Sequence, residues 1–186
     1  MADSNITKRA LSMALKALME EQPFSKINVG DICEKCDMNR KSFYYHFKDK
    51  YDLVNWTFDT EFIAAVNMAS IQAPLDERWE ETERACSYFY ENRTFYRNAL
   101  KITGQNSFSE HLRAFCFPIL KLRIENAFGT DAADDFNVDF FTDACLCAIM
   151  RWLADKDCMP PDEFVGRLKK LIYGGAAAIY QGLDQN

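Results

Sequence analysis

The stretch from Asn39 to Lys50 concentrates side chains that bind polyanions. Within twelve positions it holds Asn39, Arg40, Lys41, Ser42, Tyr44, Tyr45, His46, Lys48 and Lys50. Basic groups neutralise phosphates, while amides, hydroxyls and guanidinium groups hydrogen-bond to phosphate oxygens and base edges. Taken singly, each of these residues could belong to a solvated surface. Together they favour contact with a nucleic acid.

The charge of the chain is unevenly distributed. The 186 residues carry a net charge of −6, which by itself argues against a nucleic-acid binder. Residues 1–50 nevertheless hold nine Lys or Arg against seven Asp or Glu, whereas residues 51–186 hold thirteen against twenty-one. A mildly basic N-terminal unit on an acidic body indicates a local polyanion site. We therefore divide the chain into domains 1–50 and 51–186.

Helical periodicity predicts the elements that position this stretch. A first helix over Asn5–Glu21 carries an apolar stripe of Ile6, Ala10, Met13, Ala14 and Ala17, widened by Leu11, Leu15 and Leu18. A second helix, capped by Asn28, has Val29, Ile32, Cys33 and Cys36 on one face. Asp37 occupies the following turn, since Asp tolerates the left-handed conformation.

The third predicted helix presents the polar side chains outward. Asn39 can cap it, and Phe43 and Phe47 lie four positions apart on its buried side. Burying these two rings turns Arg40 and Lys41 towards solvent, as a helix that enters a major groove requires. Tyr44 and Tyr45 turn outward with them. Lys48, Lys50 and the N–H groups of a helix capped by Asp49 would then reach phosphates.

The remaining sequence also reads as helices. Ser107 and Glu110 form a capping box, and Pro118 should kink the helix that follows. Apolar helices are expected over Asn137–Lys156 and Glu163–Gln181, with Pro161 near the first helical position of the latter. The pattern contains no strand. The predicted fold is all-α, with about nine helices.

The segment Thr7–Phe58 resembles the N-terminal domain of the TetR/AcrR family of transcriptional regulators. The specific part is CDMNRKSFYYHFKDKYDLV, from Cys36 to Val54. The resemblance implies a three-helix helix-turn-helix domain and a helical body for effector binding and dimerisation. It also implies a homodimer on a double-stranded DNA operator. One departure is Asp37, where the family commonly has Gly. Another is Gly30, which costs about 1 kcal/mol against Ala in a helix.

The resemblance also assigns roles to individual positions. Arg40 and Lys41 fall where the family reads bases, and Ser42 and Tyr44 where it touches phosphates and at times bases. Tyr45 and His46 end the recognition helix. Lys50 matches the family's phosphate-binding Lys, and Asn28 a polar residue that contacts the DNA backbone.

The body has fewer specific signals. FYRNAL (Phe95–Leu100) and the last helices are similar to the branch that contains regulators of dihydroxyacetone kinase operons. The resemblance implies an effector pocket, for which we select aromatic residues of the middle helices. It also implies a dimer seam on the last two helices, where the GGAAA stretch permits close approach. The alternatives are packing within the core and within one subunit. The pocket residues are Phe58, Phe62, Tyr88, Phe89, Tyr96 and Phe115. The seam residues are Phe141, Cys145, Ile149, Trp152, Leu171, Gly174, Gly175 and Ala178.

Other chemistry is not indicated. Cys33 and Cys36 could form a redox pair or half a metal site, but no second pair completes it, and both fit the apolar stripe. His46 and His111 are the two histidines, too few for most acid–base sites, and no enzyme motif is found. We expect no cofactor. The longest uncharged apolar run, Leu171 to Leu183, is too short to span a bilayer, and the N-terminus has no signal peptide.

These observations predict a sequence-specific DNA-binding transcriptional regulator rather than an enzyme. It would act in the cytoplasm as a homodimeric repressor controlled by a small-molecule effector. The alternative is a helical ligand- or partner-binding protein whose DNA head has lost its function, which Asp37 and the acidic body motivate. Salt-dependent DNA affinity distinguishes the two. A small enzyme built on a helical bundle has no motif in its favour.

Overall fold

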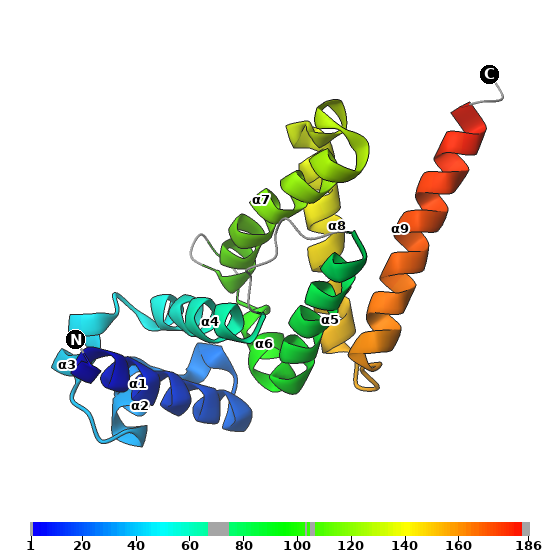
Figure 1. The fold of residues 1–186 in the computed structure, drawn as a ribbon. Coiled ribbons are helices and arrows are strands. Elements are labelled where there is room, and N and C mark those ends of the chain that lie inside the picture. The colour runs from blue at the N-terminus through cyan, green and yellow to red at the C-terminus, as the bar shows by residue number, and fades with distance from the viewer. Residues whose placement is uncertain (1, 67–74, 103, 105–106, 184–186) are drawn as a thin grey trace.

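The computed structural model describes residues 2–66, 75–102, 104 and 107–183, and all regular structure in them is helical (Figure 1). This confirms the predicted all-α fold. The elements are α1 (Ala2–Glu21), η1 (Phe24–Lys26), α2 (Val29–Lys35), α3 (Arg40–His46), α4 (Lys50–Val66), α5 (Leu75–Glu91), α6 (Arg93–Ala99), α7 (Phe108–Phe128), η3 (Thr130–Ala133), α8 (Asp135–Ala154) and α9 (Pro161–Leu183).

Helices α1 to α3 form a head at one end of the molecule, and α4 leads from it into the body (Figure 1). The packed side of α1 carries Leu11, Leu15 and Leu18, which are all buried. Ile6 and Met13 were predicted to share the packed stripe, but they are 65% and 70% exposed. The apolar residues of α1 span more than one face, and the leucine side is the one that meets the other head helices.

Short polar side chains cap the helices that build the head. The Asn28 side chain accepts a hydrogen bond from the Asp31 N–H, and the Asp31 carboxylate accepts one from the Asn28 N–H. Asn39 caps α3 by accepting from Ser42 N, and Asp49 caps α4 by accepting from the N–H groups of Tyr51 and Asp52. These three caps confirm the predictions. They satisfy helix N–H groups that have no partner within the helix.

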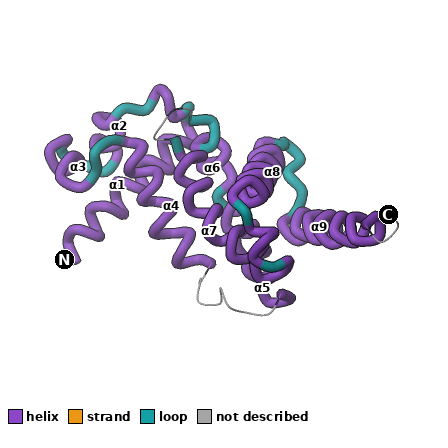
Figure 2. Tube along the Cα trace, turned by 90° about the horizontal axis from the view of Figure 1, so that it is seen from above, coloured by secondary structure: helices purple, strands orange, loops and turns teal. Residues whose placement is uncertain are grey.

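The body contains two helix pairs and the short helix α6, which contacts α1 and α8. Helix α7 packs on α8, and α5 packs on α9. Both views show α9 at the opposite end of the molecule from the head (Figures 1 and 2). Helix α7 continues through Pro118 as a single element, and Ser107 caps it. The reciprocal half of the predicted capping box is replaced, because the Ser107 N–H donates to the carbonyl of Gly104.

One hydrophobic core runs through the head and the body. It begins at Leu11 on α1, includes Phe43 and Phe58, and reaches Val165 on α9. Helix α4 contributes to both ends of it, since Leu53 and Val54 lie in the head and Phe62 in the body. Among the described residues, no helix combines the length and apolarity needed to cross a membrane.

Candidate nucleic-acid interface

The turn between α2 and α3 is a Schellman motif closed by an aspartate. Asp37 has a φ of 54°, as predicted from its tolerance of the left-handed region. Its N–H donates to the Glu34 carbonyl, and the Met38 N–H donates to the Cys33 carbonyl. These two bonds satisfy the last carbonyls of α2. The turn therefore has the geometry usually supplied by glycine, and it fixes the angle at which α3 leaves α2.

Helix α3 buries its two phenylalanines and exposes its basic side. Phe43 is fully buried and Phe47 nearly so, which confirms their predicted positions. Arg40, Lys41, Tyr44 and Tyr45 are exposed, with Tyr45 at 83%. Ser42 and His46 are half-buried. The outer side of α3 thus carries two cations and two phenols.

Arg40 and Tyr44 lie one helical turn apart and interact. A hydrogen bond between them raises the pKa of the Arg40 guanidinium. The Tyr44 ring also packs edge-on against Phe43, with ring centroids 5.4 Å apart, and this contact restricts its orientation. The Tyr44 ring is therefore partly ordered before any ligand arrives. Such preorganisation reduces the entropy lost on binding.

Two of the predicted DNA-binding residues already serve as caps. The Asn39 carboxamide oxygen accepts from Ser42 N at 2.8 Å and lies 3.2 Å from Ser42 Oγ. The Asn28 oxygen accepts from Asp31 N at 3.1 Å. A Cβ added at Gly30 would lie 2.8 Å from this Asn28 oxygen. Gly30 therefore leaves room for the cap, which explains a residue that helix propensity disfavours.

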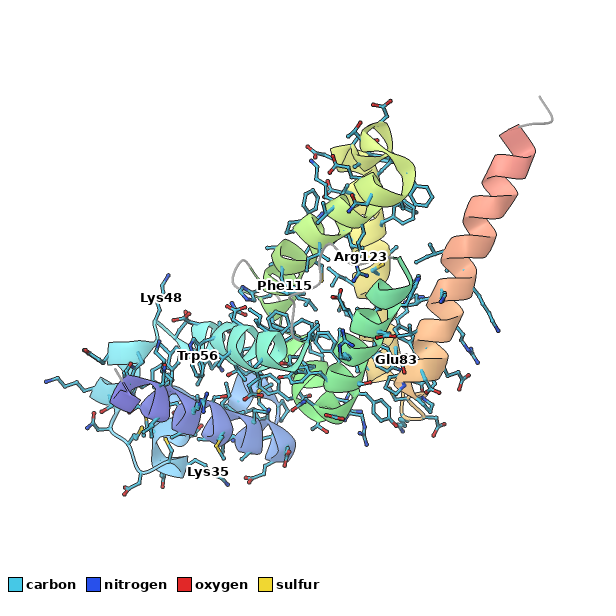
Figure 3. All side chains as sticks on the ribbon, in the orientation of Figure 1. Lys35, Lys48, Trp56, Glu83, Phe115 and Arg123 are labelled. Carbon is cyan, nitrogen blue, oxygen red and sulfur yellow. The ribbon has the colours of Figure 1, made fainter. Side chains whose placement is uncertain are left out.

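Lys48 and Lys50 differ in where their ammonium groups lie. Lys48 is exposed, and its side chain extends away from the helices (Figure 3). Lys50 is half-buried, and its Nζ donates to the carbonyls of Phe24 at 2.8 Å and Ile27 at 2.6 Å. The structure thus brings Arg40, Lys41, Tyr44 and Lys48 to one exposed end of the head. The Lys50 ammonium, by contrast, is hydrogen-bonded to backbone carbonyls within the protein.

A polar network joins the head to the body, and sequence reasoning missed it. Lys16 of α1 donates to Glu61 of α4 at 2.7 Å and to Asn92 at 3.0 Å. Tyr88 of α5 donates to the same Glu61 oxygen at 3.1 Å, and its hydroxyl lies 2.9 Å from that of Tyr96. The partners stand 45 and 76 residues apart for Lys16, so no local sequence pattern marks them.

The aromatic residues selected for an effector pocket pack against one another. Phe58 and Phe62 stack with centroids 4.7 Å apart, and Phe115 meets Phe58 edge-on at 5.2 Å. Phe89 and Tyr96 are buried in the same cluster. A groove of about 450 Å³ lies instead beside α4 and α5, and of the six selected residues it includes Tyr88 alone. Its lining is Ala65, Glu80, Glu83, Arg84, Ser87, Tyr88 and Glu91.

Apolar side chains are exposed on the two helices selected for dimerisation. Phe141 is 46% and Leu171 71% exposed, and Phe136 and Phe140 extend the exposed apolar surface of α8 to its first turn. Cys145 and Ile149 are half-buried. Gly174, Gly175 and Ala178 lie in the part of α9 whose side-chain surroundings the structure does not describe.

Trp152 is the exception among the residues selected for the seam. Its ring is 4% exposed, stacks on Phe164 with centroids 4.3 Å apart, and donates from Nε1 to the Met159 carbonyl. It therefore belongs to the core of its own subunit. The prediction that it contributes a surface at the seam was wrong, because α9 covers it.

The cysteines of α2 pack as apolar residues. Cys33 is buried beside Val29 and Ile32, and burial raises the pKa of its thiol. Cys36 lies with its sulfur 3.2 Å from the Ile32 carbonyl. All seven cysteines of the chain are free thiols. Among the described residues, no group of three His, Cys, Asp or Glu side chains is arranged to hold a metal.

Comparison with known proteins finds family models that match both parts of the chain. Residues 13–55 match the family model described as bacterial regulatory proteins, tetR family, and residues 77–174 match a model of a transcriptional regulator C-terminal region. A curated relative is the HTH-type dhaKLM operon transcriptional activator DhaS of Lactococcus lactis, 29% identical over 103 residues. That alignment covers 55% of this chain and 53% of the relative, so it spans about half of the relative's length.

Solved structures share the fold across nearly the whole chain. A TetR transcriptional regulator from Streptococcus agalactiae superposes with a TM-score of 0.69 at 19% identity, covering 89% of this chain and 93% of that one. NalD, the secondary repressor of the MexAB-OprM multidrug efflux pump in Pseudomonas aeruginosa, gives 0.67 at 18%, covering 93% and 96%. The dihydroxyacetone kinase operon activator DhaS gives 0.62 at 18%, covering 91% and 96%. With both of its parts matched by models of one family, the chain belongs to the TetR family of DNA-binding transcriptional regulators, which are not enzymes.

Proposed function

We propose that the chain binds a specific operator in double-stranded DNA as a cytoplasmic homodimer and represses transcription until a small molecule binds its body. The observation that carries the proposal is the exposed side of α3, where Arg40, Lys41 and Tyr44 stand beside the exposed Lys48. Arg40 and Lys41 would read base edges, while Tyr44, Ser42 and Lys48 would bind phosphates.

The other candidate residues support this surface from its edges. Asn28 and Asn39 hold the first turns of α2 and α3 in place, and each retains an amide group besides its capping oxygen. Tyr45 and His46 end α3, with their rings packed edge-on at 4.9 Å. Asp37 adds a negative charge in the turn. Because it also closes the Schellman motif, its presence has a structural reason and does not favour a head without function.

Dimerisation would use the exposed apolar side of α8 together with α9. Phe136 and Phe140 are 79% and 61% exposed, and a partner subunit would remove them from water. In a dimer held by such a seam, the two α3 helices would enter successive major grooves about 34–36 Å apart. Phe141 on α8 and Leu171 on α9 are also exposed and would contribute to such a seam.

Regulation by an effector would act through the network between head and body. Tyr88 both lines the groove beside α5 and donates to Glu61, and Glu61 in turn holds Lys16 of α1. A ligand that displaces Tyr88 would therefore weaken the contact between α1 and the body. To convert a population from 1:99 to 99:1, the ligand must favour one state by about 5.5 kcal/mol.

The test is fluorescence anisotropy on the DNA upstream of the protein's own gene, across a salt series, with a scrambled duplex as control. Sequence-preferring binding that weakens steeply with salt is expected. Arg40→Ala should relax base preference, whereas Tyr44→Phe should weaken binding to every sequence. If a selection from random duplexes also yields no preferred sequence, the alternative of a ligand-binding protein with an inactive head replaces the proposal.

Activation is a second candidate direction of control. It is favoured by the relative DhaS, which is a transcriptional activator. A reporter gene behind the selected operator reads the direction, since a repressor lowers and an activator raises transcription when the protein is present.

A further inference from the structure

We propose that the side chain of Lys50 is a positioning residue, which clamps the segment before α2 and supports the DNA-binding surface without itself neutralising a phosphate. The inference rests on the proposed DNA-binding function. Lys50 is the first residue of α4. Its ammonium reaches back 26 and 23 residues to the carbonyls of Phe24 and Ile27.

The contacts of the ammonium are short, and apolar rings surround them. Nζ lies 2.8 Å from the Phe24 oxygen and 2.6 Å from the Ile27 oxygen, while the Phe24 ring centroid is 4.3 Å away. The Phe24 and Tyr51 rings pack edge-on against each other at 5.2 Å and flank the ammonium. Two of its three N–H donors are therefore engaged within the protein. Burial lowers the pKa of this ammonium, and nearby Asp31 partly offsets the effect.

The clamped segment leads directly into the cap of α2. Ile27 is fully buried, and the next residue is Asn28, whose side chain and N–H form the capping box with Asp31. Holding the Ile27 carbonyl thus fixes the peptide that precedes the N-cap. Lys50 also joins the start of α4 to the segment that leads into α2, so the first turns of α2 and α4 keep a constant separation.

Lys48 offers a matched comparison two residues away. Its side chain is exposed, and its backbone N–H is held by Asp52 at 3.0 Å, so substitution of its side chain leaves that helix cap in place. A lysine that neutralises a phosphate contributes about 0.9 to the slope of log affinity against log salt, or about 1.8 for the two heads of a dimer. A lysine that only positions neighbouring groups contributes nothing to that slope.

The experiment compares Lys50→Met with Lys48→Met in the full-length protein. Thermal unfolding without DNA should show a fall in Tm of about 3–10 °C for Lys50→Met, because two hydrogen bonds from a charged group are lost. Lys48→Met should leave Tm unchanged. On DNA, Lys50→Met should weaken binding by the same factor at every salt concentration, whereas Lys48→Met should flatten the slope. Hydrogen exchange of the Asp31 amide should accelerate only in Lys50→Met.

An unchanged Tm together with a slope flattened by about 1.8 in Lys50→Met would overturn the inference and make Lys50 a phosphate ligand. An unchanged Tm and an unchanged slope would overturn it as well. Should Lys50→Met not fold, Lys50→Arg carries the test, since the guanidinium keeps the charge for a phosphate but replaces the compact ammonium by a planar fork. If the wild-type protein binds no DNA, the proposed function fails, while Tm and amide exchange still decide whether the clamp exists.

Discussion

The two tyrosines at the junction of α5 and α6 should respond very differently to loss of a hydroxyl. The Glu61 carboxylate can only accept, so the Tyr88 hydroxyl hydrogen is donated to it at 3.1 Å. Tyr96 must then be the donor across the 2.9 Å between the two hydroxyls. Burial raises the pKa of both phenols well above the ordinary value. The chain of donation therefore runs from the neutral Tyr96 phenol through the neutral Tyr88 phenol to the Glu61 carboxylate.

The direction of donation sets the expected magnitudes. Tyr96→Phe removes one hydrogen bond and leaves Tyr88 bound to Glu61, so the free energy of unfolding should fall by about 1 kcal/mol. Tyr88→Phe removes the bond to Glu61 and also leaves the fully buried Tyr96 hydroxyl without its acceptor. An unsatisfied buried donor adds about 1–3 kcal/mol, giving about 3 kcal/mol in total. The double variant has no orphan hydroxyl, so it should lose only about 2 kcal/mol.

Urea denaturation of the four proteins, at one protein concentration, measures this double-mutant cycle. The expected order of stability is wild type, Tyr96→Phe, the double variant and finally Tyr88→Phe. A double variant less stable than Tyr88→Phe would refute the assigned direction of donation. Additive effects of the two substitutions would refute the contact itself.

Three further outcomes follow from the caps and the thiols. Gly30→Ala should stabilise the protein by about 1 kcal/mol in an Asn28→Ala background. In the wild type the gain should be much smaller, because the new methyl group displaces the capping oxygen of Asn28. Urea denaturation of the wild type, the two single variants and the double variant shows whether the gain depends on Asn28. Asn39→Ala should lower stability by about 1 kcal/mol and Asn39→Ser should restore it. A DNA affinity that Asn39→Ser leaves reduced would assign the amide a DNA contact as well as the cap. In a thiol titration of the native protein, the exposed Cys147 should react first. Cys86 should stay unreactive until the protein unfolds, since burial raises the pKa of its thiol to about 12. Early labelling of Cys86 would contradict its burial.

Features set by residues within about four positions of each other were predictable from the sequence. The caps of Asn28 and Asn39, the left-handed Asp37 and the buried pair Phe43 and Phe47 all belong to this class. Each depends on a side chain and its neighbours in the same turn of helix. The head was therefore predicted in detail, down to the direction in which α3 presents its side chains.

Features that depend on which distant segments meet were not predictable. Periodicity could not decide which side of α1 is covered, so Met13 was placed on the packed stripe. Nor could it show that Phe164 of α9 covers Trp152, or that the Lys50 ammonium turns to two carbonyls more than twenty residues earlier. The contact between Lys16 and Glu61 likewise joins residues that are distant in the sequence.

The continuous core has a consequence for how the molecule unfolds. Phe58 of α4 meets rings from α6 and α7, while Leu53 on the same helix is buried among the head helices. Melting either end would expose apolar surface at the other, so a single cooperative transition is expected. A peptide ending at residue 50 would lack the whole of α4 beyond its first residue, and with it one wall of the head's core. Head and body therefore have separate tasks but constitute one folding unit, and a substitution far out in the body can lower the fraction of chains able to contact DNA.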